Sequence, residues 1–138
     1  MDIREHLQAD LLEHSGVALV SAGTRNQGTA LPALVYRCTH GEDGEDLEGV
    51  EPTHRYEFEI VIWAANLPAA IAIKNILVTR YHGQEGYQFG GREDPEVDPL
   101  EINSSRKLDE YDGDRVTDTY DDNGAVPLTV VVEFMWTE

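Results

Sequence analysis

The segment YEFEIVIWAANLPAAIAIKNIL, from Tyr56 to Leu77, constrains the fold most strongly, because it passes from a strand pattern to a helix pattern within a few residues. Its first half belongs to an alternating run from Thr53 to Ala64, which predicts a strand with one face in the core. The apolar face of this strand comprises Tyr56, Phe58, Ile60 and Ile62. A strand that leads directly into a helix indicates a sheet with that helix packed against it.

The second half of the segment predicts a helix from Pro68 to His82. Asn66 or Leu67 caps its start, the proline fits its first turn, and Gly83 follows its end. Apolar residues occur almost all round this helix, and a helix that is apolar on more than one face is buried on more than one face. We therefore expect its own sheet to cover one side and a neighbouring subunit to cover part of another, with Ile73 at this interface.

Periodicity elsewhere predicts one more helix and several strands. The helix spans Asp2 to His14, and the strands span Leu31 to Thr39, Glu101 to Leu108, Arg115 to Tyr120 and Pro127 to Thr137. Two segments rich in Gly, Pro and acidic residues, His40–Pro52 and Gln84–Pro99, predict loops. The expected fold class is α+β: one domain over residues 1–138, with a mostly antiparallel sheet, two helices packed on one face and long acidic loops.

The charge balance disfavours ordinary nucleic-acid recognition. The chain has a formal net charge of −17 with only ten Lys and Arg residues to neutralise phosphates. The acidity has three explanations: solubility in a saline habitat, repulsion of DNA inside a conduit, or imitation of DNA.

No apolar run reaches the roughly 18 to 20 residues of a membrane span, so no membrane partner is expected. The polar N-terminal residues and the single cysteine favour the cytoplasm.

The usual catalytic and metal-binding patterns are missing from the sequence. The spacing of the five histidines matches no zinc motif, and Cys38 with His40 gives two ligands but no second pair. A calcium loop counted from Asp112 fails at its fifth and sixth positions. Neither a nucleophile elbow nor a phosphate loop occurs. We therefore expect no enzymatic activity, no metal and no cofactor, with a carboxylate-pair hydrolase as the catalytic alternative.

The order of several segments matches a known pattern. They are IREHLQADLLEHSGV, LPALVYRCT, RYEFEIVIWAAN, LPAAIAIKNILVTRYHG, LDEYDGDRVTDTYDDNG and the closing strand LTVVVEFMWTE. Together they resemble the tail-completion and tail-terminator proteins of tailed bacteriophages and prophages. The resemblance covers nearly the whole chain as order and pattern, without a single invariant motif.

The resemblance implies a structural role without catalytic residues. Subunits of this kind form a ring, often a hexamer, that caps the tail tube and joins it to the head connector. The implied partners are other copies of the chain, tail-tube proteins and head-connector proteins, while DNA only passes through. The implied locations are the host cytoplasm during assembly and then the virion tail. The alternative is an acidic DNA-mimic inhibitor or another small partner-binding protein.

Two sets of residues are candidates for these contacts. Apolar residues in the predicted loops are expected to join Ile73 at interfaces: Leu47, Val50, Tyr87, Phe89 and Val97. Acidic residues in the Glu42–Glu51 and Asp109–Asp122 runs are expected on loops that face a DNA channel, in particular Asp118, Asp121 and Asp122. An acidic wall repels a polyanion and lets it slide.

Overall fold

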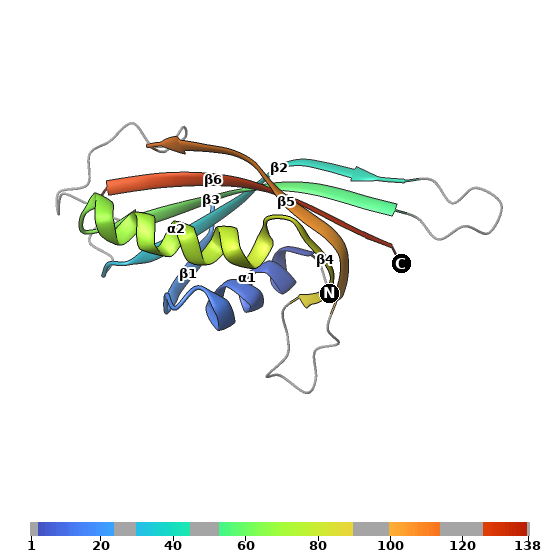
Figure 1. The fold of residues 1–138 in the computed structure, drawn as a ribbon, viewed down its shortest axis with the longest axis horizontal. Coiled ribbons are helices and arrows are strands. Elements are labelled where there is room, and N and C mark those ends of the chain that lie inside the picture. Colours follow the sequence, from blue (N-terminus) through green and yellow to red (C-terminus); the bar gives the residue numbers. More distant parts are fainter. Residues whose placement is uncertain (1–2, 24–29, 45–52, 90–99, 114–125, 138) are drawn as a thin grey trace.

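Two helices lie on the same side of a six-stranded sheet (Figure 1). The computed structural model describes residues 3–23, 30–44, 53–89, 100–113 and 126–137. The elements are α1 (Ile3–His14), β1 (Leu19–Ala22), β2 (Ala33–Asp43), β3 (Thr53–Ala64), α2 (Leu67–Tyr81), β4 (Gln84–Phe89), β5 (Leu100–Asp112) and β6 (Val126–Thr137). The strand order is β1-β2-β3-β6-β5-β4, and only β1 and β2 pair in parallel. The predicted α+β class is confirmed.

The core lies between the helices and the inner face of the central strands. β6 pairs antiparallel with β3 along its whole length, so that Phe58 faces Val132 and Ile60 faces Val130. Since alternate residues of a strand share a face, the apolar sets of both strands point to the helices together. Phe58, Ile60 and Phe134 are completely buried there. The strand predicted from Thr53 to Ala64 is confirmed without a change of bounds.

Helix α2 begins and ends where its sequence signals predict. The side chain of Asn66 accepts a hydrogen bond from the backbone N–H of Ala69 at 2.9 Å, and Pro68 occupies the first turn. Gly83 follows the helix with a φ of +68°, a conformation that favours glycine. Along the helix, Ile73 and Leu77 are buried against the sheet.

The predicted loop over Gln84–Pro99 is wrong in its first part, because residues 84–89 form the edge strand β4. Tyr87 pairs with Ile102 and Phe89 with Leu100 on β5. Tertiary pairing therefore overrides the turn signals of the glycines. Strand β5 is also longer than the predicted Glu101–Leu108, while the strand predicted over Arg115–Tyr120 lies outside the described residues.

The predicted loop over His40–Pro52 also begins too early. β2 continues to Asp43, because residues 40–43 pair with the start of β3 after a bulge at Cys38/His40. The outer ends of β2 and β3 extend beyond the helices (Figure 1). The first acidic residues of both candidate runs, Glu42–Asp43 and Asp109–Asp112, therefore lie on strands and not on loops.

Candidate assembly surfaces

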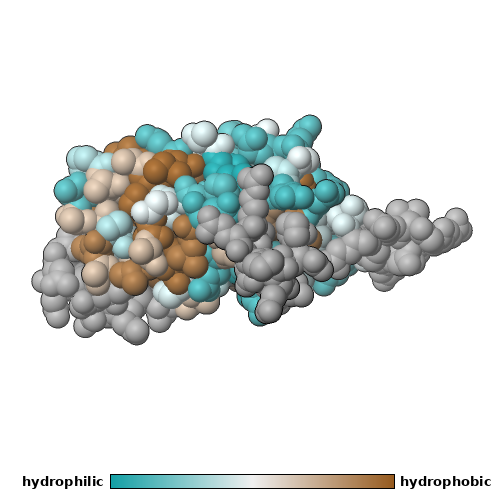
Figure 2. Space-filling model, turned by 90° about the horizontal axis from the view of Figure 1, so that it is seen from below, coloured by the Kyte–Doolittle hydropathy of each residue, from teal (hydrophilic) through white to brown (hydrophobic). Residues whose placement is uncertain are grey.

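The helix layer carries exposed apolar side chains at one end (Figure 2). On α2, Leu67 is 45% exposed, Ile71 38% and Ile76 43%. We call these three residues the apolar stripe, although Ile76 lies on the opposite flank of the exposed side from Leu67 and Ile71. Leu12 of α1 and Leu19 of β1 are also exposed. No acidic residue occurs in the chain between Ile60 and Gln84. The apolar stripe is therefore a surface without negative charge of its own on a strongly acidic protein.

The opposite side of the sheet, which we call the open face, carries buried carboxylates. Glu59 is 8% exposed and accepts a hydrogen bond from the Tyr111 hydroxyl at 2.9 Å. Arg37 lies 3.7 Å from the same carboxylate. A small apolar cluster of Ala33, Val35, Val61 and Trp63 lies on this side. Buried carboxylates require such partners, since an unpaired buried charge is very costly.

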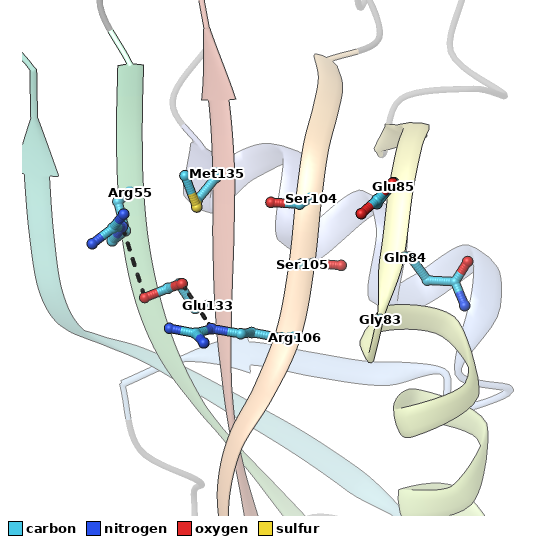
Figure 3. Close-up of a pocket in the computed structure, with 9 residues that line it drawn as sticks. All are labelled: Arg55, Gly83, Gln84, Glu85, Ser104, Ser105, Arg106, Glu133 and Met135. Carbon is cyan, nitrogen blue, oxygen red and sulfur yellow. Dashed lines mark hydrogen bonds and ion pairs between the residues drawn. The ribbon is translucent and has the colours of Figure 1, made fainter.

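A pocket of about 420 Å³ lies beside the second buried carboxylate, Glu133 (Figure 3). Arg106 donates its Nε–H to Glu133 at 3.1 Å, and the Nε of Arg55 lies 3.9 Å from the other oxygen. Ser104 and Met135 line the same pocket. The three charged side chains come from β3, β5 and β6, so the strand register brings them together.

A buried polar network joins the two helices to the edge strand β4. Asp10 is completely buried, and Arg80 and the hydroxyl of Tyr81 both donate to its carboxylate. Burial and the neighbouring Asp10 charge raise the pKa of Tyr81 well above its ordinary value. Arg80 also donates to the carbonyl of Gln88 on β4 and lies over the ring of Tyr87. This network is structural, since its donors and acceptors form hydrogen bonds with one another.

The outer ends of β3 and β6 carry an aromatic cluster beside a carboxylate. The His54 ring stacks on Trp136 with centroids 5.1 Å apart, and Tyr56 contacts the same indole at 5.2 Å. Asp43 bonds to His54 at 2.5 Å and accepts from the Tyr56 hydroxyl at 3.1 Å. The hydrogen bond from His54 lowers the pKa of the Asp43 carboxyl.

The two-layer arrangement has a counterpart among solved structures. The chain is similar to one in the "Virion of native gene transfer agent (GTA) particle". The TM-score is 0.56 at 14% sequence identity, over 99% of this chain and 92% of the other. At this identity the similarity shows the fold alone. No protein-family model matches the sequence, and no curated protein is similar to it.

The structure places three of the predicted interface residues within the fold of the chain itself. Ile73 is 8% exposed and packs in the core, and Phe89 is completely buried there. Tyr87 is partly buried, and its hydroxyl bonds to that of Ser105 at 2.7 Å. The prediction that placed Phe89 on a loop surface is wrong, because pairing of β4 with β5 turns this ring into the core.

The other predicted site residues, Leu47, Val50, Val97, Asp118, Asp121 and Asp122, lie outside the described residues. The sequence predicted a second apolar side of α2 for a neighbouring subunit, but the residue named there was Ile73 and not Leu67, Ile71 or Ile76. A signal for the apolar stripe existed, because Leu67 and Ile71 are four residues apart and neither shares the helical repeat of Ile73 and Leu77.

Among the described residues, no group of three or more His, Cys, Asp or Glu side chains could hold a metal ion. In the same part of the chain, no helix is long and apolar enough to cross a membrane.

Proposed function

We propose that this chain is a structural subunit of a tailed-phage-like particle. In this proposal it forms a ring at the head-proximal end of the tail, terminates the tail tube and joins it to the head connector. Assembly takes place in the host cytoplasm, and the finished ring is part of the virion tail. The similarity of fold to a chain of a GTA virion supports a particle component. The order of sequence segments supports the more specific station.

The observation that carries self-assembly is the apolar stripe on α2. Copies with a net charge of −17 repel one another, so a contact between them is most favourable where negative charge is missing. Leu67, Ile71 and Ile76 offer such a surface. A ring requires a heterologous contact, in which this surface meets a different patch on the next copy. Burial of these side chains contributes roughly 25 cal/mol per Å² of apolar area.

Light scattering at high and low protein concentration tests the ring. We expect a mass several times that of one chain, and we expect Ile71→Ser to lower it to that of a single subunit. Leu108→Ser is the matched control, because Leu108 is also 38% exposed but lies on β5. A single-chain mass for the unchanged protein at all concentrations contradicts the ring and favours the alternative, an acidic inhibitor that imitates DNA.

The ring would also guide DNA through its centre. We propose Asp118, Asp121 and Asp122 as part of the channel wall, where like charge weakens phosphate binding over a Debye length of about 8 Å. Replacement of all three by Lys should leave the ring mass unchanged but lower the infectivity of the particle. Full infectivity of that triple variant contradicts the channel assignment, whereas the ring itself is judged by mass alone.

A further inference from the structure

One buried carboxylate holds two arginines on the open face. The side chain of Glu133 is 6% exposed, while those of Arg55 and Arg106 are 48% and 62% exposed. Both ion pairs use the Nε end of the guanidinium group. Glu133 therefore fixes the two arginines from below and leaves their outer ends accessible in the pocket (Figure 3).

These arginines have hydrogen-bonding capacity left over. A guanidinium carries five N–H donors in a rigid fork, and one carboxylate cannot satisfy two such groups. Within the part of the chain that the structure describes, no second carboxylate lies within ion-pair distance of Arg55 or Arg106. With Glu85 included, the charged residues that line the pocket sum to zero, on a chain with a net charge of −17. The pocket thus contains a local excess of donors for an incoming anion.

The walls of the pocket indicate what kind of anion fits. Met135 supplies an apolar contact, and Ser104 supplies a hydroxyl. The side-chain amide nitrogen of Gln84 donates hydrogen bonds to the carbonyls of Thr79 and His82. The side-chain oxygen of Gln84 remains an acceptor. A volume of about 420 Å³ exceeds that of a small inorganic anion and suits side chains with a piece of backbone.

We propose that this pocket docks an acidic segment of a partner polypeptide, with one Asp or Glu carboxylate bound between Arg55 and Arg106. The guanidinium fork matches a carboxylate in a bidentate geometry. Backbone and hydroxyl groups of the segment then meet the hydroxyl of Ser104, which points into the same side of the sheet as Arg106 (Figure 3). Arg55, Arg106 and Glu133 lie on the side of the sheet opposite α2, so this contact does not use the apolar stripe.

The carboxylate of Glu85 disfavours a polyphosphate partner, because it repels phosphate groups. It lines the pocket on the β4 side, and Glu57 faces Glu133 directly across β3 and β6. A nucleic acid would bring one phosphate after another towards these carboxylates and the acidic surface around them. A polypeptide can place a single carboxylate at the arginines and neutral groups elsewhere.

The test follows the arginine Nε–H resonances by NMR during titration with a peptide that carries one Glu among neutral residues. We expect saturable shifts of both resonances, and none with the peptide in which Gln replaces that Glu. Arg106→Gln should weaken the peptide about tenfold, the effect of losing roughly one charge-assisted hydrogen bond. Arg106→Lys keeps the positive charge but loses the paired N–H donors of the guanidinium group, so this variant should bind the peptide more weakly than the unchanged protein.

Lys107→Gln is the matched control, since it removes the same charge from the next residue, which pairs with Glu110 and does not line the pocket. Thermal unfolding of each variant confirms that it is folded. Shifts that do not saturate, or an equal loss in Lys107→Gln, overturn the proposal. Inorganic phosphate that binds as tightly as the peptide indicates a small-anion site instead, and tighter binding of single-stranded DNA indicates a nucleic-acid site.

Discussion

Arg80 binds both carboxylate oxygens of Asp10 across a separation of 70 residues. Its Nη2 donates to Oδ1 at 2.8 Å and its Nε to Oδ2 at 3.2 Å, while the Tyr81 hydroxyl donates to Oδ2 at 2.6 Å. This single carboxylate ties α1 to α2, and through the carbonyl of Gln88 the same arginine reaches β4. The helix layer is thus fixed by one polar centre as well as by apolar packing.

Asp10→Ala should therefore lower the free energy of unfolding by about 3 to 5 kcal/mol, because it leaves the Arg80 charge and the Tyr81 hydroxyl without their acceptor. Urea unfolding measures the change. Glu13→Gln, one turn further along α1 and more exposed, is the control and should change the midpoint little. An Asp10→Ala protein with an unchanged midpoint would show that water replaces the carboxylate.

Alkaline pH should destabilise the protein through Tyr81 and Tyr87. Burial raises the pKa of both hydroxyls above the ordinary value of 10.0. The unfolded chain loses these protons first, so stability is fully present below pH ~10 and decreases as the pH rises above it. Urea midpoints at increasing pH, together with tyrosinate absorbance, measure this. Tyr87→Phe should make the loss shallower, and a midpoint independent of pH contradicts the assignment.

The two sides of α2 should respond differently to a charge. Ile73→Asp places a carboxylate in the core and should cost several kcal/mol, on the order of 3 or more. Ile71→Asp changes the exposed stripe and should cost less than about 1 kcal/mol in an isolated subunit. Thermal unfolding of the two variants under dissociating conditions gives the comparison. Equal losses would mean that Ile71 is also part of the intramolecular core.

Asp43 should titrate in acid below its ordinary value of 3.8, because its bond to His54 favours the ionised carboxylate. Its stabilising interaction is therefore present above the unfolded-state pKa and is lost as the pH falls through the lower folded-state pKa. NMR titration of the carboxyl carbon measures the midpoint. His54→Phe keeps the stacking on Trp136 but removes the donor, and should raise the midpoint more than Tyr56→Phe does.

The segments with strong local signals could be predicted from the sequence, and those decided by a distant partner could not. Residues 53–64 alternate up to Ile60 and are then continuously apolar, and Asn66 with Pro68 defines a helix start, so both elements follow from local chemistry. β4 contains Gly86 and precedes further glycines, and only its pairing with β5 makes it a strand. The strand propensity of a segment gives no information on which distant strand it will pair with.

The candidate surfaces also differ in whether a local sequence pattern predicts them. The apolar stripe could be read from the spacing of α2 once Ile73 is assigned to the core. Arg55, Arg106 and Glu133 lie far apart in the sequence, and they meet because β6 pairs with β3 on one side and with β5 on the other. No local pattern marks them, since each is one charged residue on the polar side of a strand.

The position of β6 also governs when the sheet can form during synthesis. β6 is the last strand along the chain, yet it lies in the middle of the sheet, between the β1-β2-β3 half and the β5-β4 half. Before it emerges from the ribosome, no strand pairing joins the two halves of the described sheet, and Glu133 is not yet present to order the arginines. Contacts that distant in sequence also form slowly. A chain that stops before β6 therefore lacks the central strand of the described sheet and the carboxylate that pairs with both arginines.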